Sequence, residues 1–424
     1  MKGALKSAGA LLLLALVFPF VAVPTLVIWL ATWGKRGPST GPTVLVTGGK
    51  MTKALQLARA FARAGYRVIL AEIPKYRWSG HRFSRAVSRF VPLPVPEADP
   101  TAYAQALADI CTQEQVSWVV PVASPVASIY DAQAAAKLPC PMVHGTPEIV
   151  ALLDDKFAFC ERARVLGLAA PNVFRITDPR QVLDFDFGAA PRPYILKRLR
   201  YDAVARLDLR KLPCPDMAAY VDGLGISPTN PWVMQEFIAG QEYCTHSTVR
   251  DGRIRLHVCC PSSPFQVNYQ AVDKPEIRDW VARFVAALNY TGQISLDVIE
   301  TAEGEIYPIE CNPRTHSAIA TFYNHPDVAK AYFESGESRI EPFPSSKPVY
   351  WLMHELWRGV TGDGAAWGRI LRGKEALWSS DDPLPFLIVP YIQIGRLLVR
   401  SILQGKDWVR IDFNIGKLVE IGGD

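Results

Sequence analysis

One stretch of sequence decides the fold of this chain, and from residue 294 to residue 314 it reads ISLDVIETAEGEIYPIECNPR. Two apolar runs lie on either side of Glu303-Gly304, a pattern typical of a β-hairpin. A two-residue turn at this step pairs Asp297 with Glu310. Their Cβ atoms then lie about 5 Å apart on one face of the hairpin.

Two directly opposed carboxylates repel one another unless a cation lies between them. Asn312 follows Glu310 by two residues and therefore shares its face. Mg²⁺ takes such oxygen ligands and usually bridges to substrate phosphates, and Arg314 adds a planar fork suited to phosphate. The pattern alone also fits a solvated hairpin with scattered charges, because Glu-Gly is a weaker turn signal than Asn-Gly.

Composition indicates a folded protein of two or three domains. The chain has 424 residues, of which 49% are hydrophobic and 21% charged. Its net charge is +5 and it has no long run of Lys or Arg, so no nucleic-acid partner is expected. None of its eight cysteines forms a Cys-x-x-Cys pair, which disfavours a zinc site and a disulfide framework and fits a reducing cytosol.

The N-terminal segment differs from the rest, because no charge occurs between Lys6 and Lys35. As a helix, residues 10–33 would extend about 36 Å, enough to cross a bilayer core, while Pro19 and Pro24 allow a kink or a re-entrant turn. We expect a membrane anchor, with a cleaved signal peptide as the alternative. Lysines at both ends leave its orientation open. A later apolar stretch, 383–400, contains two arginines and is expected to be an interfacial or core helix.

An α/β domain is predicted after the linker. Strand 43–47, a glycine turn, helix 51–64 and strand 66–72 form a βαβ unit of a parallel, Rossmann-like sheet. The glycine turn is not G-x-G-x-x-G, so it offers little support for a dinucleotide site. Loops at the carboxyl ends of such strands hold ligands. The candidate substrate contacts in these loops are His81, Arg82, Ser124 and Ser128.

Further downstream, lysines and a short strand precede the hairpin. Lys156 lies within a helical segment, and Lys197 ends the strand 193–197. The strand 232–238 leads to Glu242. The order Lys, Lys, strand, Glu, Asp and Glu-x-Asn-x-Arg resembles the ATP-grasp superfamily, and the resemblance covers residue 43 to about residue 321.

The resemblance implies a Rossmann-like pre-ATP-grasp α/β domain followed by a two-subdomain α+β ATP-grasp fold. It implies that Lys156 and Lys197 contact the phosphates of ATP and that Arg314 steadies the transferring phosphate, so that Lys197 and Arg314 are the expected catalytic residues. The implied Mg²⁺ ligands, with Mn²⁺ as an alternative ion, are Asp297, Glu310 and Asn312. The implied adenine hinge is Gln235, Glu236, Phe237 and Ile238, and the implied ribose partner is Glu242.

One departure from the superfamily follows Lys197. Many ATP-grasp enzymes have a glycine-rich phosphate loop here, but residues 198–206 contain no glycine. Backbone cradling of phosphate is therefore in doubt. Positive side chains would then bind the phosphates in place of the backbone, and the candidates are Arg198, Arg200 and Arg206. The alternative is that these arginines are ordinary surface residues.

Seven motifs extend the resemblance over nearly the whole chain. They are 48-GGKMTKALQLA-58, 79-SGHRFS-84, 121-PVASPVAS-128, 153-LDDKFAF-159, 244-CTHSTVRDG-252, 311-CNPRTHSA-318 and 412-DFNIGKLVE-420. They resemble the ATP-grasp ligases of mycosporine-like amino acid biosynthesis, whose members join glycine to the cyclohexenone 4-deoxygadusol and give mycosporine-glycine, a UV-absorbing metabolite. The resemblance implies this reaction here. An ordinary carboxylate–amine ligase and a membrane-tethered nucleotide-binding module remain the alternatives.

The expected organisation follows from these segments. The predicted domains are an anchor and linker at 1–42, a pre-ATP-grasp domain at 43–147, an ATP-grasp domain at 148–345 and a C-terminal extension at 346–424. Arg250, His316 and Ser317 are the candidates for acceptor binding, whereas His246 and His354 are expected to be structural. We expect small-molecule substrates, a catalytic body in the cytosol and membrane association through the N-terminus. A homodimer is one assembly that the sequence leaves open.

Overall fold

The computed structural model describes the chain except for residues 1, 35–38, 123–125, 200–208, 264–267 and 421–424. Ser124, Arg200 and Arg206, which the sequence offered as substrate or phosphate contacts, lie outside the described residues.

A parallel sheet follows the N-terminal helix, as the βαβ pattern predicts. Its strand order is β3-β2-β1-β4, with helix α2 packed on β2 and helix α3 on β4. The central strand β1 is buried along its whole length because a parallel sheet is covered on both faces. The bounds are β1 (Thr43–Val46), α2 (Thr52–Arg63), β2 (Arg67–Glu72), β3 (Arg89–Pro92), α3 (Pro100–Gln113), β4 (Val116–Val120) and α4 (Ser128–Ala135).

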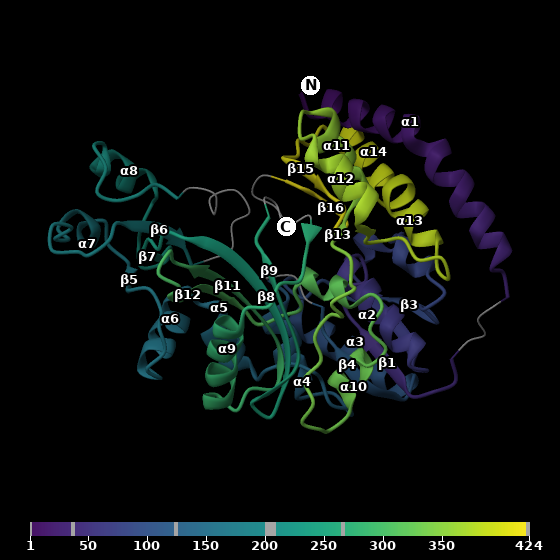
Figure 1. The fold of residues 1–424 in the computed structure, drawn as a ribbon, viewed down its shortest axis with the longest axis horizontal. Helices are drawn as coiled ribbons and strands as arrows, with labels where there is room; N and C mark the ends of the chain where they lie inside the picture. Colours follow the sequence, from purple (N-terminus) through teal and green to yellow (C-terminus); the bar gives the residue numbers. More distant parts are fainter. Residues whose placement is uncertain (1, 35–38, 123–125, 200–208, 264–267, 421–424) are drawn as a thin grey trace.

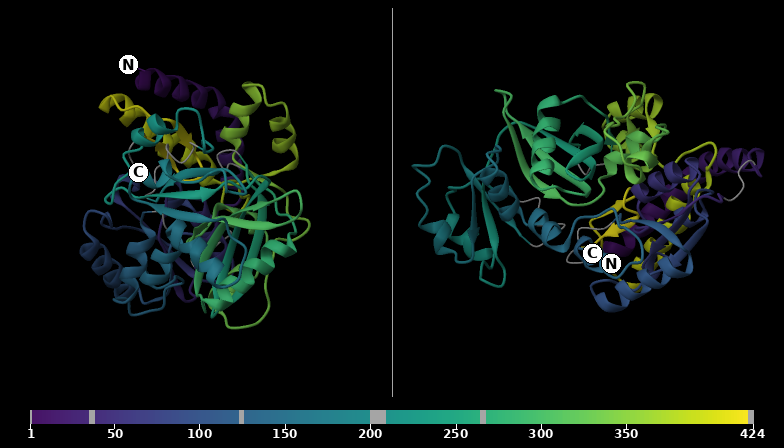
Figure 2. Two further views of the ribbon diagram at one scale, coloured as in Figure 1. Left: turned by 90° about the vertical axis from the view of Figure 1, so that its left-hand side faces the viewer. Right: turned by 90° about the horizontal axis from the view of Figure 1, so that it is seen from below.

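Two antiparallel sheets build the middle of the chain. The smaller has the order β5-β7-β6 and the larger has the order β12-β11-β8-β9. Their strands are β5 (Val173–Ile176), β6 (Tyr194–Arg198), β7 (Trp232–Glu236), β8 (Gln241–Arg250), β9 (Arg253–Pro261), β11 (Gly292–Glu300) and β12 (Ile306–Asn312). The helices are α5 (Pro147–Asp154), α6 (Lys156–Val165), α7 (Arg180–Leu183), α8 (Met217–Gly223), α9 (Pro275–Ala287) and α10 (Val328–Phe333). Figures 1 and 2 show the smaller sheet, with α7 and α8, at the end of the molecule opposite α1.

The hairpin β11–β12 has the predicted pairing but not the predicted turn. Asp297 lies opposite Glu310, as expected. The two-residue turn is wrong, because Thr301 and Glu305 close a three-residue loop in which Gly304 has a φ of +82°. A bulge in β12 at Ile309 shifts the register back by one residue, so the two differences cancel.

Helix α1 (Lys2–Ala31) is continuous, with Pro19 and Pro24 inside it. It packs along α13 (Leu384–Ile388) and α14 (Gly395–Gln404), as Figures 1 and 2 show. Among the described residues, two helical stretches are long and apolar enough to cross a bilayer, residues 3–31 and 384–404. The predicted helix at 383–400 is therefore present, as α13, a π-helical turn and α14.

The remaining C-terminal elements surround this helical pair. They are β13 (Val349–Tyr350), α11 (Leu352–Val360), α12 (Ala365–Arg372), β14 (Lys374–Glu375), β15 (Arg410–Asp412) and β16 (Lys417–Val419). Strand β13 pairs with β10 (Asn268–Tyr269), so the C-terminal residues join a sheet with a segment from the middle of the chain. One continuous hydrophobic core includes residues of α2 together with Trp351, Leu377 and Leu398.

A buried ion pair fixes α2 to the C-terminal residues. The Nε atom of Arg59 lies 2.9 Å from Oδ2 of Asp382, and the two side chains are 2% and 1% exposed. The same carboxylate accepts hydrogen bonds from Oγ of Ser84 and the backbone N–H of Arg85. A charge pair so completely removed from water needs each of these partners, because either partner left alone is an uncompensated buried charge.

We predict that Asp382→Ala lowers the free energy of unfolding by about 3–5 kcal/mol, because Arg59 then remains buried without a counter-charge. Asp381→Ala is the matched control, since its carboxylate pairs with the partly exposed Arg63 at 3.6 Å. Its cost should stay below about 1 kcal/mol. Urea unfolding monitored by circular dichroism measures both, and equal losses in the two variants would contradict the structural role of the buried pair.

Candidate active site

The opposed carboxylates of the hairpin lie against two lysines from other elements. The Nζ atom of Lys156 is 3.3 Å from Oε1 of Glu310. Lys156 is the first residue of α6, and the Asp155 side chain caps that helix by accepting from the N–H groups of Phe157 and Ala158. The cap fixes where α6 begins and so where the Lys156 side chain leaves the backbone.

Lys197 belongs to β6 of the smaller sheet and carries the second positive charge. Burial lowers the pKa of Lys197, and Lys156 lowers it further, while the negative charge of Glu310 opposes both effects. The smaller sheet therefore supplies a cation to carboxylates of the larger sheet. The structure brings Lys156, Lys197, Asp297 and Glu310 together, although they are spread over more than 150 residues of sequence.

Arg314 is joined to this cluster through Asn312. Its Nη2 donates to Oδ1 of Asn312, and its Nη1 lies 3.2 Å from Oδ1 of Asp154. The amide of Asn312 in turn donates from Nδ2 to Oδ2 of Asp297 at 3.5 Å. These contacts link Arg314 through Asn312 to Asp297.

The two carboxyl groups differ in their electrostatic surroundings. Burial raises the pKa of Asp297, and the charges of Glu310 and Glu242 raise it further. Burial acts on Glu310 in the same direction, but the charges of Lys156, Lys197 and Arg314 outweigh it and lower its pKa. Of these two carboxyl groups, Asp297 is thus the one whose negative charge is less compensated by the protein.

The donor set fits a hard cation such as Mg²⁺. Oδ1 of Asp297 is buried and has no hydrogen-bond partner among the described residues. The described part of the chain contains no group of three or more His, Cys, Asp or Glu side chains suited to a metal. The protein therefore offers two carboxylates and the Asn312 amide, and phosphate and water oxygens must complete the coordination, as is usual for Mg²⁺.

The predicted adenine hinge lies at the end of β7, and its side chains are already occupied. Gln235 donates to the backbone O of Ile309 at 2.9 Å, the carbonyl that the bulge in β12 presents. Glu236 pairs with Arg192 at 3.1 Å, and the N–H of Phe237 donates to Pro193. Only backbone groups remain for a ligand, and within the described residues the N–H of Ile238 has no partner.

Glu242 lies at the exposed start of β8 and pairs with Ile299 across the sheet. Its charge acts on Asp297. Glu242 therefore lies on the same side of the larger sheet as the carboxylates, at the end next to the hinge. This position is compatible with the predicted contact to ribose.

The loop after β2 does not join the cluster. His81 is fully buried, its Nδ1 lies 2.9 Å from the backbone O of Gly49, and burial lowers its pKa to about 3. Arg82 is exposed and packs over the ring of Trp78. No contact within the described residues links either side chain to the carboxylates, so the structure does not place His81 and Arg82 with the other candidates.

Ser128 and Arg250 each donate a hydrogen bond to a backbone carbonyl group. The Ser128 hydroxyl donates to the backbone O of Pro313 at 3.1 Å, which ties α4 to the segment that carries Arg314. Arg250 lies at the opposite end of β8 from Glu242, donates to the backbone O of Tyr332 at 2.9 Å and packs over Trp118. Ser128 adjoins the cluster, whereas Arg250 is remote from it.

His316 and Ser317 lie two and three residues after Arg314, and His316 is half-buried whereas Ser317 is buried. The His316 ring caps the 3-10 helix η5 (Ser317–Phe322) by accepting from the N–H of Ala318, and its edge meets Tyr269 at 5.4 Å between centroids. Oγ of Ser317 accepts from Nδ2 of Asn414 at 2.8 Å. Both residues remain candidates for contact with the acceptor.

Three polar residues near the site had no predicted role. Lys53 of α2 donates to the backbone O of Thr315 at 2.6 Å, and burial together with the charges of Arg314 and Lys50 lowers its pKa to about 7. Asp154 pairs with Arg314, and Asn414 reaches Ser317 from the C-terminal hairpin. Each occurs in a motif that supported the family resemblance, and this was the only sequence signal for them.

A scan against protein-family models and a search of curated proteins found no match. Solved structures do match. N5-carboxyaminoimidazole synthetase from Staphylococcus aureus is 13% identical with a TM-score of 0.55, covering 73% of this chain and 81% of its own.

Two further solved structures are similar to this chain over most of its length. The ADP complex of an N5-carboxyaminoimidazole ribonucleotide synthetase gives a TM-score of 0.57 at 13% identity, over 77% of this chain and 86% of that one. Phosphoribosylamine–glycine ligase from Thermotoga maritima gives 0.52 at 16% identity, over 72% of this chain and 78% of that one. The chain therefore has the ATP-grasp fold that these ligases share.

Proposed function

We propose that the protein is an ATP-dependent ligase that forms a C–N bond. The γ-phosphoryl group of ATP passes to an oxygen of an acceptor, and an amine then displaces phosphate from the activated carbon, with release of ADP. One observation carries the proposal: two opposed carboxylates, a buried oxygen of Asp297 without a partner, and three cationic side chains meet between the two antiparallel sheets.

The residues of the chain have separable tasks in this proposal. Asp297, Glu310 and Asn312 would hold Mg²⁺, which neutralises phosphate charge when bound. Lys156 leaves Glu310 for a phosphate oxygen, and Lys197 approaches the phosphates from the smaller sheet. Arg314 would stabilise the charge that develops on the transferring group. Phosphoryl transfer depends mainly on positioning and charge neutralisation, so this set of residues meets its chemical needs.

For the acceptor we propose 4-deoxygadusol, and for the amine glycine, which gives mycosporine-glycine. The seven motifs of the family resemblance support this assignment. The chemistry is consistent, because the enol of a cyclic 1,3-dicarbonyl is a vinylogous carboxylate whose oxygen can accept a phosphoryl group. A ligase that makes an ordinary amide through an acyl phosphate is the second candidate, favoured by the fold shared with phosphoribosylamine–glycine ligase.

We also propose that the catalytic body lies in the cytosol, where ATP is available, and that α1 seats it on a membrane. The exposed apolar surface of α1 supports this placement. Protection of the catalytic body from protease in inverted vesicles would contradict it.

Substrate identity is tested by incubating the protein with ATP, Mg²⁺ and one acceptor at a time. With 4-deoxygadusol we expect glycine-dependent release of ADP and a new near-UV absorbance. Release of ADP with simple carboxylic acids alone would exclude the mycosporine assignment and favour the second candidate. No acceptor-dependent ADP release with any of them would contradict ligase activity itself.

Replacement of Glu310 tests the metal site. We predict that Glu310→Ala lowers ATP turnover by a factor of 100 or more, roughly the loss expected when one main source of electrostatic stabilisation is removed. Glu303→Ala is the matched control, because Glu303 lies in the turn of the same hairpin and is exposed. It should keep wild-type turnover, and wild-type turnover in Glu310→Ala would show that the metal site is wrong.

The charge of Asp297 makes a prediction for stability. A carboxyl group whose pKa is raised in the folded state costs stability once the pH exceeds its value in the unfolded chain. Asp297→Asn should therefore stabilise the metal-free protein at pH 8, by an amount on the order of 1 kcal/mol, and not at pH 4.

Thermal unfolding measures this effect, and added Mg²⁺ provides the comparison. Mg²⁺ with ADP should raise the Tm of the wild type at pH 8 and have a smaller effect on Asp297→Asn. Equal shifts in the two proteins would contradict the assignment of Asp297 as a ligand.

A further inference from the structure

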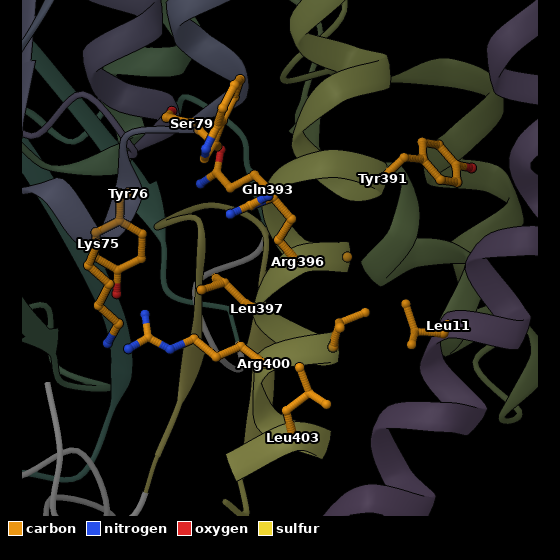
Figure 3. Close-up of a pocket in the computed structure, with 13 residues that line it drawn as sticks. Leu11, Lys75, Tyr76, Ser79, Tyr391, Gln393, Arg396, Leu397, Arg400 and Leu403 are labelled. Carbon is orange, nitrogen blue, oxygen red and sulfur yellow. The ribbon is translucent and has the colours of Figure 1, made fainter.

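A cavity of about 520 Å³ lies outside the candidate active site, between α14, the segment 75–79 and α1. Its walls combine long aliphatic side chains with cations, as Figure 3 shows. The cations are Lys75, Arg396 and Arg400, and no Asp or Glu is among the described residues that line the cavity. Among the described residues Arg396 and Arg400 have no counter-charge, and two like charges held close together repel one another, so this cavity favours an anion.

The arginines of α14 are directed into the cavity. In Figure 3 the Arg400 side chain points from α14 toward Lys75 and Tyr76. The guanidinium of Arg396 lies 5.5 Å from the centre of the Trp78 ring, which Arg82 approaches to 5.4 Å. Within the described part of the chain, neither Arg396 nor Arg400 has a hydrogen bond or an ion pair.

Helix α1 contributes Leu11 to the opposite wall of the cavity, and most of this helix is apolar. Helix α1 packs through a narrow seam that includes Ser7, Leu14, Val21 and Thr25, all buried. Oγ of Ser7 donates to Oγ of Ser401 at 3.3 Å, which fixes α1 against α14. The seam recurs every seven or four residues, so only one stripe of α1 is covered.

The rest of α1 is apolar and exposed. Its apolar residues with more than half of their area exposed are Leu5, Leu12, Leu16, Phe20, Val23, Val27 and Leu30, and Trp33 just beyond its end is exposed too. On α14, Val399 and Leu403 are exposed at positions that share a helix face, next to Arg396 and Arg400, and Ile392 of the preceding π-helical turn is exposed as well. Apolar surface and cationic cavity therefore lie side by side along two packed helices.

We propose that this cavity binds the phosphate headgroup of an anionic phospholipid, while α1 and the exposed face of α14 lie in the acyl region of the same leaflet. Arg396 and Arg400 bind the phosphate, and Leu11, Val399 and Leu403 contact the first carbons of the acyl chains. Charge complementarity and the continuity of cavity and apolar face identify a bilayer lipid as the occupant. The inference rests on the proposed membrane seating and goes beyond it, because it assigns lipid selectivity to defined residues.

Vesicle flotation of the full chain tests the proposal, with phosphatidylcholine vesicles prepared with or without phosphatidylglycerol. The wild type should bind the phosphatidylglycerol vesicles more tightly, and the double variant R396Q/R400Q should lose roughly tenfold or more of that affinity. The control R180Q/R283Q removes two exposed arginines from α7 and α9, on the opposite side of the molecule in Figure 1, and should keep the wild-type preference. The variant R396K/R400K retains the positive charge and should keep most of the preference for phosphatidylglycerol vesicles.

The outcomes separate this proposal from the membrane seating and from a soluble ligand. Binding to neither kind of vesicle overturns the seating and the lipid site together, whereas equal binding to both overturns the lipid site alone. Equal losses in R396Q/R400Q and R180Q/R283Q show unspecific attraction and overturn the site. Glycerol phosphate that competes as well as phosphatidylglycerol vesicles also overturns it, in favour of a soluble phosphate. ATP turnover and thermal unfolding of each variant confirm that the fold is intact.

Discussion

The structure depends on one electrostatic constraint, the opposition of Asp297 and Glu310 in neighbouring strands of the larger sheet. Two carboxylates held face to face are unfavourable unless positive charge surrounds them. The fold supplies that charge from three directions: from the start of α6 through Lys156, from β6 through Lys197, and from the segment after β12 through Arg314. The arrangement of the two antiparallel sheets makes physical sense as the means of bringing these cations to one hairpin.

The sequence predicted the pairing of Asp297 with Glu310 because the information for it was local. The two-residue period of a strand places Asn312 on the face of Glu310, and hairpin pairing places Asp297 opposite it. The predicted turn was wrong, but the predicted pairing was still correct, because the three-residue loop and the bulge at Ile309 shift the register in opposite directions. The βαβ pattern at the start of the globular chain likewise predicted a parallel sheet, and the structure has one.

The positions of the other polar residues depend on distant packing. His81 follows a strand of the parallel sheet, as a ligand contact would, but it is buried against Gly49. Arg250 lies in β8, the strand that also carries Glu242, but at the opposite end of that strand. Lys53 and Asn414 reach the site only because α2 and the C-terminal hairpin pack beside residues 315–317, a contact over long sequence separations that no local pattern encodes.

The C-terminal residues connect the apolar surface to the site by a continuous series of contacts. Gln393, which lines the basic cavity, accepts from the N–H of Gly80 and donates to the backbone O of Gly416. The same hairpin turn carries Asn414, which donates to Ser317 beside Arg314. The surfaces proposed for membrane seating and for catalysis thus share one packed scaffold.

The most direct measurement of the central claim is a crystal structure with ADP and Mg²⁺ bound. The account predicts a metal ion about 2.1 Å from oxygens of Asp297 and Glu310, with Lys156 moved from Glu310 to a phosphate. A metal ion bound elsewhere, or an unbroken Lys156–Glu310 pair beside bound nucleotide, would contradict it.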